Sequence, residues 1–257
     1  MKIYSWNVLF RNKKPDEAFS FIRDADWDIF CLQEVPEALL ERLRTLPSFI
    51  AYRSDAEKMF ASGSVKLFNV VLSRFPIQQQ GEIPFPEYTN LYTWRTRLFV
   101  RLMRPFHFSR LRNRGGLFVD VIAHGRPLRV FNLHLILARP VWRLEEFERA
   151  MAKRDPARAS VVCGDFNIVE SLHITPLNWL FGGHPSEAVL YRSERTRIEE
   201  RFVAHEVCNP LRGKSTHPLS RSQLDHILVS NSFSIKNAEV LSDRIGSDHC
   251  PIRVEVT

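Results

Sequence analysis

The sequence has few cysteines, and none of them has a spacing in which thiols act together. The four cysteines of this 257-residue chain include no Cys-x-x-Cys pair. This argues against a thiolate zinc site, and a chain of this length buries enough surface to fold without disulfides. Cys31 and Cys163 lie within apolar runs, where small buried thiols are common. We therefore expect all four to be structural.

Long apolar segments are absent as well. No run approaches the ~20 apolar residues that a membrane-spanning helix needs. The first residues, Met1 to Ser5, pass directly into an expected strand, so we expect no signal peptide. The sequence shows no internal repeat and no low-complexity linker. We expect one domain over residues 1–257 and a cytoplasmic location.

Acidic residues are missing from one part of the chain that is rich in arginine. The formal net charge is +7 at pH 7. Seven arginines and no acid lie between Arg95 and Arg114, and outside this window the basic and acidic residues balance. A local excess of positive charge indicates an anionic partner more than it indicates general solubility.

Apolar runs and turn residues predict short strands with helices between them. The expected strands cover residues 3–8, 28–32, 65–72, 117–123, 128–133, 161–164, 224–229, 238–241 and 252–256. Helices are expected from Pro15, from Pro36, over 141–153 and over 176–181. Residues 78–114 are interpreted as a basic, aromatic insertion, and residues 184–223 as irregular chain. This pattern favours an α/β (α+β) fold in which two packed sheets are covered by helices.

Acids, amides and imidazoles follow the ends of these apolar runs. Side chains at strand ends from distant parts of a chain commonly meet in one cleft. The set consists of Asn7, Glu34, Asn132, His134, Asp165, Asn167, Asp225, His226, Asp248 and His249. Because it is rich in hard oxygen ligands and contains no clustered thiols, it suits Mg²⁺, with Mn²⁺ as a substitute, far better than zinc.

The order of these motifs resembles the endonuclease/exonuclease/phosphatase superfamily. The resemblance extends from Ser5 to Pro251. It rests on Ser5-Trp6-Asn7, Leu32-Gln33-Glu34, Asn132-Leu133-His134, Gly164-Asp165-Phe166-Asn167, Leu224-Asp225-His226 and Ser247-Asp248-His249. It implies a four-layered α/β sandwich of two packed, mainly antiparallel sheets flanked by helices. The Asn-Leu-His form is similar to the branch of pancreatic-type deoxyribonuclease, sphingomyelinases and tyrosyl-DNA phosphodiesterases. That deoxyribonuclease places a glutamate near the strand after the insertion, where this chain has Arg114-Gly115-Gly116.

The resemblance also implies roles for the metal-binding residues and for the acid that acts on water. Glu34 is the expected metal ligand, with Asp248 as a second ligand and Asn7 supporting the metal or the phosphate. Asp165 is expected to orient or deprotonate the attacking water, and Asn167 to hold the phosphate or the nucleophile.

The imidazoles have expected roles of their own. His134 and His249 are expected to flank the phosphate as acid–base or electrophilic groups, since an imidazole with a pKa of about 6.5 suits both tasks. Asp225 is expected to orient His249, and either Asp165 or His249 takes the proton of the water. His226 is interpreted as a core histidine. The remaining histidines are treated as ordinary: His107, His124, His173, His184, His205 and His217.

Three functions remain open at this stage. The first is a Mg²⁺-dependent phosphodiesterase that cleaves nucleic acid, DNA above all, with Asn132, Arg97, Arg101 and Arg104 contacting the substrate. The second is a phospholipid or inositol-phosphate phosphoesterase whose basic segment lies on an anionic membrane. The third is a binding module without turnover. No protein partner is implied, and we expect a monomer.

Overall fold

The computed structural model describes residues 1–257 except 61–62, 104–109, 172–175, 181, 184 and 186–192. One sheet contains β1 (Lys2–Asn7), β2 (Ile29–Pro36), β3 (Phe49–Phe60), β4 (Gly63–Ser73), β6 (Arg110–Arg112), β12 (Ile235–Val240) and β13 (Ile252–Val256). The other contains β5 (Ile77–Pro84), β7 (Gly115–Ala123), β8 (Arg126–His134), β9 (Ala159–Asp165), β10 (Val207–Cys208) and β11 (Asp225–Ser230). Their spatial orders are β12-β13-β1-β2-β4-β3-β6 and β10-β11-β9-β8-β7-β5.

Most neighbouring strands in both sheets are antiparallel. Among the described strands, the parallel pairs are β1 with β2 and β8 with β9. The first and last strands meet in the first sheet, where Lys2 lies opposite Glu255. The predicted pair of mainly antiparallel sheets is confirmed, and so is the expectation that the terminal strands lie together.

Apolar residues fill the space between the sheets because each strand sends alternate side chains inward. Ile3, Ile29 and Val254 contribute from the first sheet, and Val130 and Val161 from the second. Cys31 and Cys163 belong to the same cluster. All four cysteines are free thiols, as expected for structural residues.

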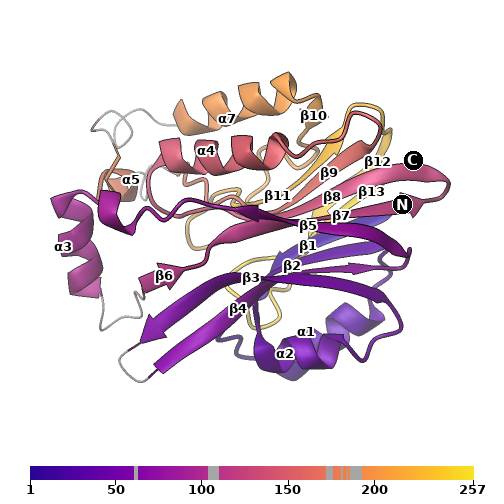
Figure 1. Ribbon diagram of the computed structural model, residues 1–257, viewed down its shortest axis with the longest axis horizontal. Helices are drawn as coiled ribbons and strands as arrows, with labels where there is room; N and C mark the ends of the chain where they lie inside the picture. Colours follow the sequence, from indigo (N-terminus) through magenta and orange to yellow (C-terminus); the bar gives the residue numbers. More distant parts are fainter. Residues whose placement is uncertain (61–62, 104–109, 172–175, 181, 184, 186–192) are drawn as a thin grey trace.

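Helices cover the outer faces and complete the four layers (Figure 1). The first sheet carries α1 (Pro15–Asp24) and α2 (Glu37–Leu43), and the second carries α4 (Pro140–Met151) and α7 (Ser193–Ala204). Pro15 occupies the first turn of α1, where a missing N–H costs nothing. Each outer layer has an apolar core of its own, built on Trp6 and Phe30 in one and on Phe147 and Phe166 in the other.

Strand β3 and helix α7 are among the regular elements that the sequence did not predict. Strand β3 was not predicted, although it pairs with β4 along its whole length. Helix α7 lies within residues 184–223, which were expected to be irregular. Its apolar stripe is narrow: Ile198 and Phe202 are buried against the core while much of the helix is polar. Periodicity is a weak signal for such a helix.

The predicted insertion at 78–114 is too long. Residues 77–84 form β5, which pairs with β7 and is the edge strand of the second sheet. The rest of this segment includes the short 3-10 helix η1 (Thr89–Leu91) and α3 (Trp94–Met103), which contacts α5 (Pro176–Leu180). Hence the added segment starts after β5.

Asn132 joins the two sheets instead of facing a substrate. The residue is completely buried on β8. Its amide nitrogen donates to the carbonyls of Leu32 on β2 (2.9 Å) and Val70 on β4 (2.8 Å), and its oxygen accepts from the side chain of Gln33 (2.7 Å). We therefore correct the prediction that Asn132 contacts substrate, since every polar atom of its side chain is used within the core.

Asn132→Ala is expected to destabilise the fold, because it removes three buried hydrogen bonds that join the two sheets. The expected loss in the free energy of unfolding is about 1–3 kcal/mol, measured by urea titration. Asn237→Ala, at an exposed position of β12, is the matched control and should leave stability unchanged. Equal stability of the two variants would contradict the bridging role.

Candidate active site

Strand register brings three of the predicted residues side by side. His134 and Asp165 are the last residues of β8 and β9 and lie opposite each other, while Asp225, the first residue of β11, lies opposite Asp165 on its other side. Asn7 ends β1 in the facing sheet. The strand ends therefore gather at one edge of the sandwich, as the sequence predicted.

Two imidazoles converge on one oxygen of Asp165. The Nε2 of His249 lies 3.7 Å from Oδ2 of Asp165, and the Nε2 of His134 lies 3.8 Å from the same atom. Behind each ring is a buried carboxylate: Asp225 is 2.8 Å from Nδ1 of His249, and Asp55 is 2.6 Å from Nδ1 of His134. The centre of the site is thus an acid between two histidine–aspartate pairs.

These carboxylates keep both imidazoles protonated. Burial alone would lower the pKa of His249, but Asp225 and Asp165 outweigh it and raise that pKa to about 10. In the same way Asp55 outweighs burial and raises the pKa of His134 to about 9. At neutral pH both rings therefore carry a proton on each nitrogen and act as hydrogen-bond donors.

Asp55 is the functional residue that sequence reasoning missed. It lies on the unpredicted strand β3, is completely buried, and is also bonded to the side chain of Asn69 (3.2 Å). The related deoxyribonucleases suggested a carboxylate near Arg114-Gly115-Gly116 instead. In this structure Arg114 donates to the carbonyl of His134 (2.7 Å). A polar residue in a strand of mixed character gives no signal of its own in the sequence.

Two amides fix the orientation of Asp165. The side-chain nitrogen of Asn7 donates to Oδ2 of Asp165 (3.0 Å), while its oxygen accepts from the backbone of Leu9 (3.0 Å). The backbone N–H of Asn167 donates to Oδ1 of Asp165 (2.9 Å), and its side chain donates to the carbonyl of Leu135 (2.9 Å). Both residues lie in the site as predicted, and these contacts give them a positioning role.

Glu34 lies near a bulge of β2, with a left-handed backbone. Its φ is 54°, which is rare for a residue with a side chain and is typical of functional positions. The strand register shifts between Leu32 and Val35. Its carboxylate pairs with the Nζ of Lys58 (3.1 Å) and accepts from the N–H of Phe10 (3.4 Å).

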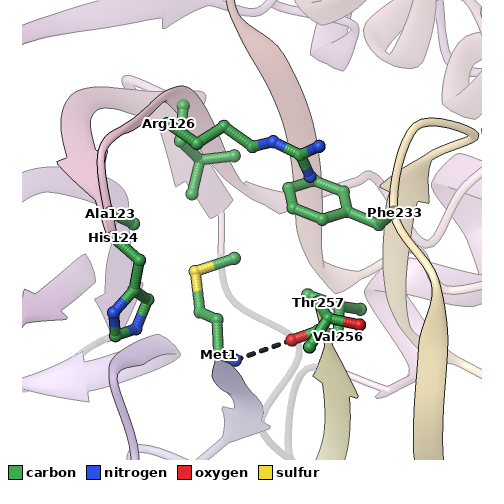
Figure 2. A pocket seen from close by; sticks show the side chains of 8 residues that line it. Met1, Ala123, His124, Arg126, Phe233, Val256 and Thr257 are labelled. Carbon is green, nitrogen blue, oxygen red and sulfur yellow. Dashed lines mark hydrogen bonds between the residues drawn. The ribbon is translucent and has the colours of Figure 1, made fainter.

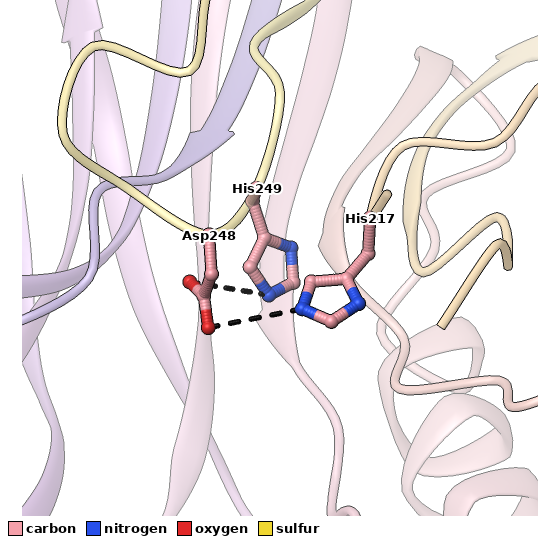
Figure 3. Close-up of side chains that lie close together, drawn as sticks. All are labelled: His217, Asp248 and His249. Carbon is pink, nitrogen blue, oxygen red and sulfur yellow. Dashed lines mark ion pairs between the residues drawn. The ribbon is translucent and has the colours of Figure 1, made fainter. Parts of the chain in front are cut away.

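Asp248 has an unexpected neighbour, His217. Figure 3 shows His217 and His249 on one side of this carboxylate, with the Nε2 of His217 3.8 Å from Oδ2 and that of His249 4.0 Å from Oδ1. Partial burial would raise the pKa of Asp248, but the two imidazoles lower it to about 2. Treating His217 as an ordinary histidine was wrong, because its loop packs against the site.

His226 is a core residue, as predicted. It is completely buried and stacks on Phe166. Its Nε2 accepts from Arg195 (2.7 Å), so its Nδ1 donates to the carbonyl of Leu224 (2.9 Å). Burial and the charge of Arg195 lower the pKa of His226 well below its usual value. It therefore stays neutral beneath the site.

The donor set fits a hard divalent cation. Among the described residues, two clusters lie close enough to share an ion: His217 with Asp248 and His249, and Asp165 with Asp225 and His249. Glu34 adds a further carboxylate outside these clusters. Oxygen and imidazole donors without thiolate suit Mg²⁺ or Mn²⁺. Asp248 belongs to one of these clusters, whereas Glu34 belongs to neither, so metal binding by Glu34 and the supporting role of Asn7 stay predictions.

The predicted arginines lie on α3, beside the His134 side of the site. Tyr88 and Tyr92, which precede α3, pack on Trp142 together with Ile136, two residues beyond His134. Arg97 and Arg101 are exposed. Arg104 lies outside the described residues. The contact of Arg97 and Arg101 with substrate stays a prediction.

One cavity with mainly apolar walls lies away from this chemistry. Figure 2 shows residues that line it, among them Met1, which precedes β1, and Val256, the last residue of β13. Its volume is about 440 Å³ and its walls are mainly apolar. It contains none of the predicted site residues.

Comparison with known proteins identifies the family. The profile of the endonuclease/exonuclease/phosphatase family matches residues 4–249. The chain belongs to this family. Members are metal-dependent hydrolases that act on phosphoester bonds. A search of the curated proteins returns no significant match.

Solved structures share the fold at low sequence identity. A family member from Beutenbergia cavernae is 18% identical, with a TM-score of 0.69 over 100% of this chain and 71% of that one. A humanized TDP2 from D. rerio is 14% identical, with a TM-score of 0.62 and coverage of 100% and 98%. A mannosyl-6-phosphatase from Bacteroides thetaiotaomicron is 18% identical, with a TM-score of 0.59 and coverage of 100% and 99%. These likenesses show the fold alone.

Asp55→Asn is expected to lower the pKa of His134 from about 9, because it removes the main charge that favours the protonated ring. The pKa of His134 in the folded protein lies above its unfolded value of about 6.5. Protonation of His134 therefore stabilises the metal-free protein in full below pH ~6.5, and this contribution is lost as the pH rises through about 9. NMR titration of the ring in EDTA measures the shift. Asp24→Asn, on the exposed end of α1, is the control; an unchanged pKa in Asp55→Asn would refute the assignment.

Proposed function

We propose that the protein is a Mg²⁺-dependent phosphodiesterase that cleaves nucleic acid, DNA most readily, by in-line attack of water. The observation that carries this proposal is the convergence of two protonated, carboxylate-backed imidazoles on Asp165. A phosphodiester needs donors for its non-bridging oxygens, a positioned water and a proton for the leaving oxygen. This cluster supplies all three from one edge of the sandwich.

The raised pKa values assign the proton transfers. His134 and His249, with pKa values of about 9 and 10, hold their protons at neutral pH and donate from Nε2 to phosphate oxygens or to the leaving oxygen. Asp165, oriented by Asn7, is the remaining group able to take the proton of the water. Of the two proposals for the general base, we therefore favour Asp165.

A bound divalent ion would neutralise charge on the phosphate and on the leaving oxygen. Glu34 and Asp248 would hold it, and Mn²⁺ should replace Mg²⁺ because both prefer oxygen ligands. The buried carboxylates Asp55 and Asp225 keep the two rings in position. We propose that the enzyme works as a cytoplasmic monomer.

Nucleic acid is favoured by the exposed face of α3. Trp94 is exposed, and Arg97 and Arg101 lie one and two turns further along the helix. Arginines interleaved with aromatic rings follow a phosphate backbone and stack on bases. The resemblance to TDP2, a tyrosyl-DNA phosphodiesterase, supports the same class, whereas the neighbour named as a mannosyl-6-phosphatase shows that this fold also serves sugar phosphates.

A lipid phosphodiester is the second candidate. Leu91, Trp94 and Leu98 are all exposed along η1 and α3, and an apolar stripe beside arginines also suits an anionic membrane surface. None of the helices in the described part of the chain is long and apolar enough to cross a bilayer. Membrane contact would therefore be made by this face.

His249→Ala should reduce the nicking of supercoiled plasmid in Mg²⁺ by about 10²–10⁴-fold, since it removes a proton donor at the phosphate. Agarose gels over a time course measure the rate, and EDTA should abolish it. His124→Ala, in the exposed turn between β7 and β8, is the matched control. If the wild-type protein cleaves neither DNA nor RNA in Mg²⁺ or Mn²⁺, the nuclease proposal fails.

The variant Arg97→Ala/Arg101→Ala separates the two substrate classes. For a nuclease, it should weaken DNA binding and lower the steepness of log K against log salt by about 0.9 for each phosphate that is no longer neutralised. Fluorescence anisotropy with a labelled duplex measures both. Release of phosphorylated head groups from liposomes, without DNA cleavage, would support the lipid candidate instead. A salt dependence identical to the wild type would remove these arginines from the binding surface.

A further inference from the structure

A second, polar pocket lies beside the catalytic cluster. Its volume is about 310 Å³. It is lined by Glu170, Ser171, Arg195, Thr196, Arg212, Gly213, Ser215 and Arg221. Three arginines thus face a single glutamate. None of these residues has a role in the proposed hydrolysis.

The arginines of this pocket differ in burial and in whether a carboxylate pairs with them. Arg195 is buried, and its guanidinium pairs with Glu170 (2.9 Å) while also donating to His226 and to the carbonyl of Gln223. It lines the pocket, and its charge is paired with Glu170 and also with Glu199 (3.5 Å). Arg212 and Arg221 are exposed, and within the described part of the chain their guanidinium groups have no partner. The net positive charge of the pocket therefore lies on these two side chains.

The pocket is attached to the catalytic cluster by Thr216. Its hydroxyl accepts from the backbone N–H groups of Leu224 (3.0 Å) and Asp225 (2.9 Å), and its carbonyl accepts from Cys250 (2.8 Å). Thr216 is thereby fixed between the two chain segments that carry Asp225 and His249.

The residues on either side of Thr216 face different sites. Ser215 lines the pocket, whereas His217 lies against Asp248. Two residues of extended chain span at most about 7 Å. The pocket and the Asp248 side of the catalytic cluster are therefore joined by a short stretch of chain.

We propose that this pocket binds a second phosphate of the same substrate, next to the phosphate that is cleaved. Arg212 and Arg221 supply the forked donors that match phosphate oxygens, as arginine does more effectively than lysine. This inference rests on the proposed phosphodiesterase function and narrows it to substrates with more than one phosphate, of which an oligonucleotide is the simplest. A substrate with a single phosphodiester gains nothing from the pocket.

The test compares Arg212→Ala/Arg221→Ala with the wild type on two substrates in Mg²⁺. With an oligonucleotide, KM should rise by about tenfold while kcat stays unchanged, because the variant cannot form two charge-assisted hydrogen bonds that lie away from the reacting bond. With bis(p-nitrophenyl) phosphate, both constants should stay unchanged. Lys153→Ala/Lys236→Ala removes the same charge from exposed positions elsewhere and is the matched control, and Arg212→Lys/Arg221→Lys should restore part of the KM.

Inorganic phosphate provides a readout that does not need turnover. In EDTA, the wild type should bind it by calorimetry and the double alanine variant should bind it several-fold more weakly. During turnover, phosphate should compete with the oligonucleotide more strongly than with bis(p-nitrophenyl) phosphate. Equal competition against both substrates would mean that the pocket is separate from substrate binding, and would overturn the inference.

Two failures can be told apart. If the wild type cleaves no nucleic acid, the proposed function fails, and the binding of inorganic phosphate still reports on the pocket. If the wild type cleaves the oligonucleotide but the double alanine variant has the same KM and the same affinity for phosphate, the second-phosphate site is refuted. A KM that rises equally on both substrates would also refute it.

Discussion

The chemistry of the protein depends on the shared position of Asp165 between two imidazoles. That position follows from the pairing of β8, β9 and β11, which sets His134 and Asp225 opposite Asp165 on its two sides. The second imidazole, His249, then reaches the same oxygen from the loop before β13. A shift of one residue in either pairing would turn these side chains to the opposite face of the sheet. The active site is therefore a consequence of strand register.

Burial gives this arrangement its electrostatic character. Burial disfavours the protonated form of each ring. The buried carboxylate beside each ring outweighs this effect, so both rings keep their positive charge. Other residues support the site from further away. Asn132 joins the two sheets, Arg114 holds the end of β8, and Thr216 fixes the loop of His217. The same loop carries Arg212 and Arg221 of the second pocket, which relates the proposed substrate selection to the geometry of the catalytic carboxylates.

Much of the fold was predictable from the sequence because polar residues follow apolar strands in a recurring order. The ends of β1, β2, β8 and β9 were located within a few residues, and most of the residues predicted there lie in the site. Asn132 was misjudged because sequence cannot tell an amide that faces a cleft from one that joins two sheets. Metal binding by Glu34 and Asp248 was predicted from the family pattern and stays a prediction, although Asp248 lies in a cluster that could hold an ion.

The missed features have a common physical reason. Asp55 lies on a strand whose burial depends on its neighbours β4 and β6, so its role appears only after the sheet has formed. His217, Arg212 and Arg221 lie in a loop that is fixed by tertiary hydrogen bonds, so no periodic pattern marks them in the sequence. Helix α7 has few apolar positions, and its place is set by packing on Phe166. Local sequence carries little information about any of them.

The most direct measurement is a crystal structure with Mn²⁺ and an oligonucleotide that has a phosphorothioate at the cleavage site. Anomalous scattering locates the ion, and the density locates the phosphate. We predict the ion at Glu34 and Asp248 and a phosphate oxygen within hydrogen-bonding distance of Nε2 of both His134 and His249. A phosphate bound elsewhere on the protein, or an ion away from both carboxylates, would contradict the proposed mechanism.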